Sequence, residues 1–264
     1  MEYDINVIKE ISPSDNMFQG NEEHYFNVGQ SALNAILIGM QISNKDKSTI
    51  KRILDLPSGH GRVLRYLRSF FPTCEIMACD IDKDGVDFCS KTFGATSLYS
   101  SKNVDEISFM ESFDLIWCGS LFTHLDKNNW ISFLNLFTTN LEDNGLLIFT
   151  VHGRQTQNFM ELKKVDYGLE KSSVKKLLQN YKKNGFGYED YPGQRNYGIS
   201  ISTPSFVLSL LEKRTDLKIL VYNEKGWDNH QDVIVCQKEN CYNNQIEQVD
   251  TFTKLKSKFL NILT

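Results

Sequence analysis

Two glycines that follow a short apolar run could hold a nucleotide-like ligand. The run covers residues 53–56, with Asp55 near its end, and Gly59 and Gly61 lie just beyond it. Glycine lets the backbone approach a ligand closely because it has no side chain. Residues 63–71 repeat apolar side chains at helical spacing, so the unpaired N–H groups at the start of that helix face the turn. The pattern predicts a strand, a glycine turn and a helix around a bound ligand.

An acidic residue after the next apolar run narrows the kind of ligand. Asp80 lies 25 residues after Asp55, at the end of a second predicted strand. A carboxylate there can accept hydrogen bonds from both hydroxyls of a ribose. The alternative is that Asp80, Asp82 or Asp84 caps the following helix. A dinucleotide-binding loop would need a third glycine where this chain has Leu64, so the spacing argues against NAD.

The segment Asp55-x-x-x-Gly59-x-Gly61-Arg62 resembles the first motif of class I S-adenosylmethionine-dependent methyltransferases, D-x-G-x-G-x-G, with Pro57 at the first glycine. The resemblance covers residues 50–151, and residues 203–238 by topology only. It implies S-adenosylmethionine as cofactor and methyl transfer to an oxygen, with nitrogen as second choice, of a small polar molecule such as a saccharide or a natural-product intermediate. The residues that it places at the cofactor are Tyr25, Asp55, Pro57, Ser58, Gly59, Gly61, Arg62, Asp80, Ile81, Ser101, Cys118 and Gly119.

Three histidines follow predicted strands, where the ligand crevice of an open parallel sheet lies. His124 follows the fourth strand, His152 ends the fifth, and His230 lies in the connection between the last two. A hydroxyl nucleophile gains from a base that takes its proton near neutral pH, which suits histidine. We favour His152 and His230, oriented by Asp228 or Asp232, although a structural role is the alternative for each histidine. The predicted substrate-binding residues are Arg154, Tyr197 and Trp227.

Strand-like and helix-like segments alternate along the chain and predict an α/β fold. We expect a Rossmann-like, doubly wound, seven-stranded sheet that is mostly parallel with an antiparallel last strand. Helices are expected over 21–40 and 172–181, and Thr203 with Pro204 predicts another helix start. The predicted domains are an N-terminal helical lid (1–48), a cofactor-binding core (49–152), an inserted substrate cap (153–202), the completion of the sheet (203–240) and a tail helix (241–264).

Composition limits the partners. The 264 residues carry a net charge of -4 without a basic cluster, which argues against nucleic acid and favours a small-molecule substrate. The six cysteines form no C-x-x-C pair, so we expect buried thiols in a reducing compartment and no metal site. The polar start and the lack of a long apolar run predict a cytoplasmic protein with no membrane span. The amphipathic tail would pack on this domain or on a second subunit, as in a homodimer.

Two other functions fit parts of the pattern. A non-catalytic binding module with this fold is an alternative, because Pro57 replaces the first glycine and the base is ambiguous. An NAD-binding oxidoreductase is a weaker alternative, because the third glycine is missing. Conversion of the cofactor in the presence of hydroxylated small molecules would separate the enzyme from the module.

Overall fold

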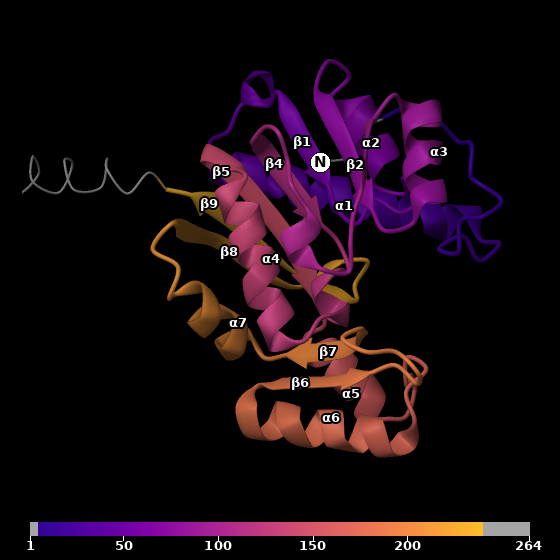
Figure 1. Ribbon diagram of the computed structural model, residues 1–264, viewed down its shortest axis with the longest axis vertical. Helices are drawn as coiled ribbons and strands as arrows, with labels where there is room; N and C mark the ends of the chain where they lie inside the picture. Colours follow the sequence, from indigo (N-terminus) through magenta and orange to yellow (C-terminus); the bar gives the residue numbers. More distant parts are fainter. Residues whose placement is uncertain (1–4, 240–264) are drawn as a thin grey trace, which may run out of the picture.

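The structure, a computed structural model, describes residues 5–239 and contains a seven-stranded sheet (Figure 1). The strands are β1 (Arg52–Asp55), β2 (Glu75–Asp80), β3 (Thr96–Tyr99), β4 (Phe113–Cys118), β5 (Leu141–Val151), β8 (Leu217–Trp227) and β9 (Gln231–Lys238). Their order is β3-β2-β1-β4-β5-β9-β8. The first five run parallel, whereas β9 is antiparallel to β5 and β8. The predicted fold class is confirmed.

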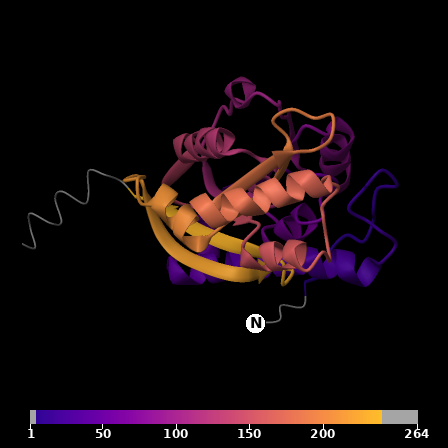
Figure 2. The same cartoon turned by 90° about the horizontal axis from the view of Figure 1, so that it is seen from below.

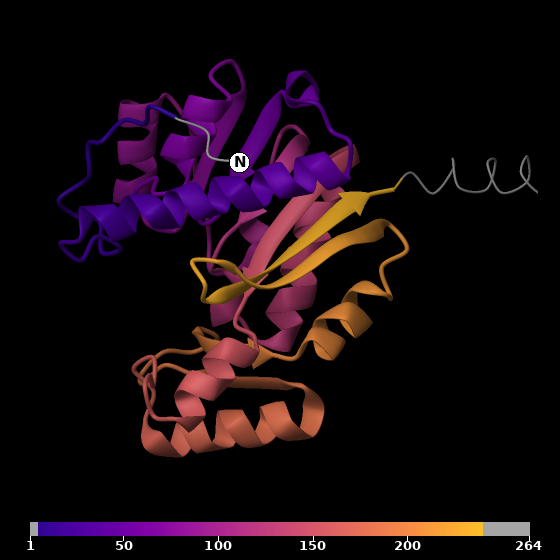
Figure 3. The same ribbon diagram turned by 180° about the vertical axis from the view of Figure 1, so that it is seen from behind.

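Helices cover both faces of this sheet. One layer holds α1 (Glu22–Ile42), α2 (Leu64–Phe70) and α3 (Lys83–Phe93), and the other holds α4 (Lys127–Thr139) and α7 (Pro204–Leu211). Neighbouring strand residues point to opposite faces, so Ile53 packs in the first core and Leu54 in the second. From behind, α1 crosses the sheet as one long helix (Figure 3). Short 3₁₀ helices occur at η1 (Lys47–Thr49), η2 (Val104–Glu106) and η3 (Phe122–His124).

The helix starts expected from the sequence have local causes that the structure confirms. The side chain of Asn21 accepts a hydrogen bond from the His24 N–H at 3.0 Å and begins α1. The Thr203 hydroxyl accepts the Phe206 N–H at 3.2 Å, with Pro204 in the first turn of α7. Side-chain caps therefore fix both helix starts.

The connection between β8 and β9 lies at the ligand edge of the sheet. Val151, the last residue of β5, pairs with Asp232 of β9, and Trp227 pairs with Gln231. The connecting residues 228–230 therefore lie beside the carboxyl end of β5. This register brings His152 and His230 to one edge, as predicted.

Residues 153–202, here called the cap, form a separate small layer. The cap contains α5 (Arg154–Glu161), α6 (Lys171–Asn184), β6 (Phe186–Asp190) and β7 (Gly198–Ser202). The helix predicted over 172–181 is confirmed within α6, whereas α5 and the β6–β7 hairpin were not predicted. Figure 2 views the molecule from below, with the cap in front of the sheet. The Ser202 N–H donates to the His152 carbonyl at 2.9 Å and ties the hairpin to the end of β5.

Several predictions concern parts or properties that the structure does not test. The tail helix (241–264) lies outside the described residues, so the tail helix and the homodimer stay predictions. The division into lid, core and cap and the cytoplasmic location stay predictions as well. None of the helices within residues 5–239 is long and apolar enough to cross a membrane.

Replacing Leu177 by alanine should destabilise the cap. Leu177 is fully buried in the cap core, whose members also include Ile199 and Ile201. Losing a buried leucine costs about 2 to 5 kcal/mol of unfolding free energy. Leu162→Ala is the matched control, because Leu162 is 65% exposed and surface changes cost about 0.5 kcal/mol or less. Urea denaturation of both variants measures the difference, and equal unfolding free energies would contradict this role of Leu177.

Candidate active site

A cavity of about 330 Å³, here called the main cavity, lies at the carboxyl ends of β1, β2 and β4. Its predicted lining residues are Pro57, Ser58, Gly59, Arg62, Asp80, Gly119, His124, Tyr197 and Trp227. It is also lined by Asp15, Asn16, Met17, His60, Val63, Asp82, Trp117 and Ser120, which the sequence did not single out as site residues. The glycine turn, the second-strand acid and one of the three histidines therefore share one space.

A second cavity of about 440 Å³, the side cavity, adjoins the main cavity. The two cavities share Pro57, Asp80 and Tyr197. The side cavity also contains the predicted residues Ile81 and Ser101, together with the apolar side chains of Leu121, Leu125 and Phe133. Gln194, Arg195 and Asn196, from the β6–β7 connection, also line it, as do Leu56, Ser100 and Lys102. Asp80 and Tyr197 thus lie where a ligand would pass from one cavity to the other.

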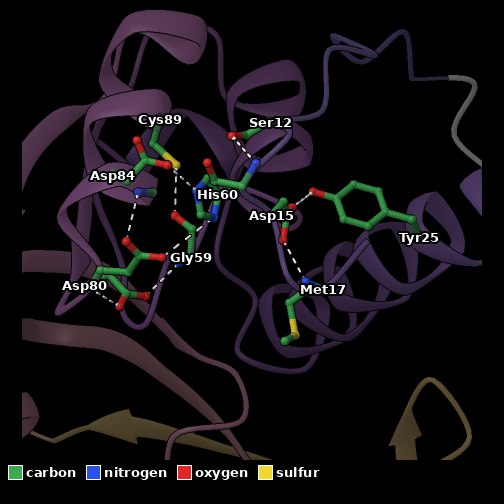
Figure 4. A network of polar contacts seen from close by, with 12 residues as sticks. Ser12, Asp15, Met17, Tyr25, Gly59, His60, Asp80, Asp84 and Cys89 are labelled. Atoms are coloured by element: carbon green, nitrogen blue, oxygen red, sulfur yellow. Dashed lines mark hydrogen bonds and ion pairs between the residues drawn. The ribbon is translucent and has the colours of Figure 1, made fainter. Parts of the chain in front are cut away.

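The Asp80 carboxylate fixes the glycine turn (Figure 4). One oxygen accepts the Gly59 N–H at 2.7 Å, and the other accepts the Asp82 N–H at 2.9 Å. Burial raises the pKa of Asp80, while these backbone donors act in the opposite direction. Asp82 caps α3 through the Gly85 N–H at 3.4 Å, so among the three acids considered for that role Asp82 is the cap. Each oxygen of Asp80 retains a further lone pair for a ligand hydroxyl.

The glycine turn has the shape of a ligand cradle. Gly59 and Gly61 have positive φ angles of 50° and 79°, a backbone conformation that favours glycine. A Cβ on Gly85 of α3 would lie 2.6 Å from the Gly59 carbonyl oxygen, so only glycine lets α3 pack this closely. Beneath the turn, Asp55 is buried, and one of its carboxylate oxygens has no hydrogen-bond partner in the described chain. Burial and the nearby Asp80 charge raise the pKa of Asp55.

The chain before α1 forms one wall of the main cavity through Asp15, Asn16 and Met17. A buried polar network, part of which Figure 4 shows, holds this segment in place. The Tyr25 hydroxyl donates to the Asp15 carboxylate at 2.6 Å and accepts from the Arg65 guanidinium at 3.2 Å. Arg65 also donates to the carbonyls of Ile8 and Glu10. Tyr25, predicted at the cofactor, is therefore buried behind the wall, and Asp15 and its neighbours line the cavity. The polar, irregular sequence of this segment gave no signal for that role.

His124 is the predicted base candidate that lines the main cavity. Its Nδ1 lies 2.9 Å from the Gly198 carbonyl oxygen and 3.3 Å from the Tyr191 hydroxyl, and its ring stacks on Tyr197 at 5.1 Å. A carbonyl oxygen only accepts, so we assign the proton to Nδ1, which leaves a lone pair on Nε2. Burial lowers the pKa of His124, so the ring is neutral at neutral pH.

His152 and His230 lie together and line neither cavity. Their ring centroids are 5.4 Å apart, and the His230 Nε2 lies 2.9 Å from the Tyr167 hydroxyl. His152 is buried, and its Nδ1 has no hydrogen-bond partner among residues 5–239. Burial lowers the pKa of both histidines.

The predicted orienting acids have other partners. The buried Asp232 accepts from the Tyr222 hydroxyl at 2.8 Å and the Lys225 N–H at 2.9 Å. Asp228 lies 3.8 Å from the His24 imidazole. Neither carboxylate makes a hydrogen bond to His152 or His230 in the described chain, so their role as orienters stays a prediction.

The other predicted residues differ in their positions. Arg154 is largely exposed and paired with Glu224, and it lines neither cavity. Cys118 is fully buried in the sheet core and Gly61 lies inside the turn, so neither lines a cavity. Trp227 is a cavity wall, as predicted, and its indole N–H donates to the Val28 carbonyl at 2.9 Å.

The cavity residues that the sequence analysis did not predict lie in two kinds of segment. Trp117 and Ser120 flank the predicted Cys118 and Gly119 at the end of β4, so the strand position itself was their signal. Residues 194–196 and 15–17 reach the cavities from segments distant in the sequence, and no local pattern marks them. No group of three or more His, Cys, Asp or Glu side chains arranged to hold a metal occurs in the described part of the chain.

Comparison with known proteins identifies the fold. Residues 53–145 match the family model of a methyltransferase domain. No curated protein matches the sequence significantly. Among solved structures, the chain is similar to an S-adenosylmethionine-dependent methyltransferase from Clostridium acetobutylicum, with a TM-score of 0.55, 13% identity and coverage of 80% of this chain and 92% of that one. The PH0226 protein from Pyrococcus horikoshii gives a TM-score of 0.57 at 13% identity, covering 87% of this chain and 97% of that one.

A third similar structure contains a bound ligand. It is the plantazolicin methyltransferase BpumL in complex with S-adenosylhomocysteine (SAH) and a pentazolic desmethylPZN analog, with a TM-score of 0.54, 13% identity and coverage of 80% of this chain and 86% of that one. The structural matches confirm the class I methyltransferase fold. With the family match, residues 53–145 are a methyltransferase domain, in agreement with the predicted enzyme class and with S-adenosylmethionine as the predicted cofactor.

Replacing Gly85 by alanine should weaken binding of SAH. The new Cβ would lie 2.6 Å from the Gly59 carbonyl oxygen, so the turn or α3 must shift. Overpacking of this kind costs about 1 to 3 kcal/mol, and we expect part of it as weaker binding. Calorimetric titration measures the affinity, and Lys91→Ala, an exposed position on the same helix, is the control. An unchanged affinity in Gly85→Ala would show that the close approach is not needed.

Proposed function

We propose that the protein transfers the methyl group of S-adenosylmethionine to an oxygen of a small polar molecule, such as a saccharide or a natural-product intermediate. The observation that carries the proposal is the main cavity, where a neutral imidazole, His124, faces the same space as the glycine turn and Asp80. A volume of about 330 Å³ suits the reacting part of a small ligand.

The residues present fit the cofactor. The apolar side cavity, with Ile81 and Ser101, would hold the adenine, and the Asp80 carboxylate would accept the ribose hydroxyls. The Arg62 guanidinium, which lines the main cavity beside Trp227, would hold the carboxylate of the methionine portion. When bound, the cofactor supplies an electrophilic methyl group. The protein's part is to hold this group and the acceptor in line.

His124 is the residue that would take the proton from the acceptor hydroxyl. Its Nδ1–H is committed to the Gly198 carbonyl, so Nε2 has the lone pair that a base needs. His152 and His230, which the sequence favoured, line neither cavity, and we give them the role of packing against Tyr167 of the cap. A neutral imidazole with a free lone pair among the residues that line the main cavity favours an enzyme over a non-catalytic binding module.

Replacing Asp80 by alanine should reduce the affinity for SAH roughly tenfold to a hundredfold, the range expected for lost charge-assisted hydrogen bonds. The variant also loses the support of the Gly59 N–H. Calorimetry with SAH and, separately, with NADH measures the effect. Glu75→Ala, at the exposed other end of β2, should bind SAH like the parent protein. Binding of NADH alone would contradict the proposed cofactor site.

Replacing His124 by asparagine should lower kcat by about 10² to 10⁴ and leave the affinity for SAH nearly unchanged. Asparagine can still donate to the Gly198 carbonyl but has no group in place of Nε2. In the parent protein kcat should fall only when the pH drops below the ordinary pKa of histidine, because burial lowers the pKa of His124. His152→Asn and His230→Asn are the matched controls. The rate of SAH formation with a panel of hydroxylated small molecules gives kcat. Loss of turnover in one of the controls, but not in His124→Asn, would show that the histidine replaced in that control is the base.

A further inference from the structure

Three residues at the ends of β4, β5 and β9 form a closed ring of hydrogen bonds beside the main cavity. The Ser120 N–H donates to the Thr150 hydroxyl at 2.8 Å. The Thr150 hydroxyl donates to the Gln231 side-chain oxygen at 2.6 Å, and the Gln231 side-chain nitrogen donates to the Ser120 hydroxyl at 2.7 Å.

The direction of the bonds in this ring is fixed by burial. Thr150 is fully buried, and its oxygen already accepts the Ser120 N–H. Its own proton therefore needs an acceptor, and the Gln231 oxygen supplies it. Turning the Gln231 amide around would place its NH₂ against Thr150 and leave the Thr150 proton buried without a partner, which is costly. The Gln231 NH₂ group consequently faces Ser120.

The Ser120 hydroxyl is thereby left with a proton that the ring does not use. Ser120 lines the main cavity and accepts from Gln231, so its O–H can donate to a ligand there. Its φ of 62° is unusual for a non-glycine residue and places the side chain at the tight turn after β4. The same turn leads to His124, because the Thr123 hydroxyl donates to the Ser120 carbonyl at 2.6 Å and the His124 N–H donates to the Leu121 carbonyl at 2.9 Å.

We infer that Ser120 orients the acceptor by donating a hydrogen bond to an oxygen next to the hydroxyl that His124 deprotonates. The turn after β4 then presents one donor and one acceptor to the substrate. It selects molecules with oxygens on neighbouring carbons, such as a vicinal diol, over molecules with a single hydroxyl. This inference rests on the proposed methyl transfer to oxygen, and Gln231 acts in it as the residue that keeps the Ser120 proton directed at the ligand.

Matched pairs of acceptors test the inference: cis-cyclohexane-1,2-diol against cyclohexanol, and catechol against phenol. We expect the parent protein to prefer the dioxygen member by roughly fivefold to tenfold in kcat/KM, the effect of one neutral hydrogen bond. The difference should lie mainly in KM. Ser120→Gly removes the hydroxyl without straining the positive φ and should abolish the preference. Ser120→Ala should do the same, which separates the hydroxyl from the backbone.

Gln231→Glu gives a second, independent variant that keeps Ser120. An ionised carboxylate only accepts hydrogen bonds, so the Ser120 proton should turn toward it and away from the ligand. The diol preference should fall as in Ser120→Gly, and the affinity for SAH should stay unchanged in all three variants.

Three results would overturn the inference. A preference retained in Ser120→Gly, or lost in Ser120→Ala alone, would exclude the hydroxyl as its source. If the parent protein turned over cyclohexanol and phenol with the same kcat/KM as their dioxygen partners, the selectivity would be absent and the proposed methyl transfer would still stand. Turnover of neither diol would also reject the inference, and the methyl transfer itself is then judged separately by SAH binding and by the His124 variant.

Discussion

The hydrogen bond from the Gly59 N–H to the Asp80 carboxylate is the contact on which the site depends. It joins the turn after β1 to the end of β2, and the second oxygen of Asp80 holds the Asp82 N–H at the start of α3. Helix α3 returns to the same turn, because Gly85 lies against the Gly59 carbonyl. One buried carboxylate thus positions a turn, a strand and a helix, so contacts within the chain shape the cradle.

The cap positions the other half of the site. Its hairpin supplies the Gly198 carbonyl and the rings of Tyr191 and Tyr197, which together hold the His124 imidazole. Gly198 must be glycine, since a Cβ there would lie 1.9 Å from the Glu189 carbonyl oxygen in the facing strand. The connection between the two hairpin strands also lines the side cavity. The cap is therefore joined both to the proposed base and to the proposed adenine region.

The sequence predicted the sheet and the cofactor turn well because local patterns determine them. Apolar runs mark strands, helical spacing marks helices, and Asn21 and Thr203 mark helix starts. The cap hairpin escaped prediction because its glycine-rich and tyrosine-rich sequence has no clear alternation. The structure places the three predicted histidines after the strands that the sequence indicated, but which ring lines the cavity depends on packing by the cap. Asp15 reaches the cavity through the distant residues Tyr25 and Arg65, which no local pattern records.

The charged residues of the main cavity serve mainly cofactor binding, whereas the neutral His124 serves the proposed reaction. Three carboxylates, those of Asp15, Asp80 and Asp82, line it together with the cation of Arg62. Their negative charge favours binding of a cationic cofactor. The positive charge of the cofactor is greatest before the methyl group is transferred, so these carboxylates stabilise the bound cofactor more than the transition state. They therefore support affinity more than rate. A neutral base does not add to the negative charge that stabilises the cofactor before the reaction. A deprotonated carboxylate as base would become neutral only as it took the proton, whereas His124 has no charge until that moment. The lowered pKa of His124 is thus suited to a cavity whose charges serve cofactor binding.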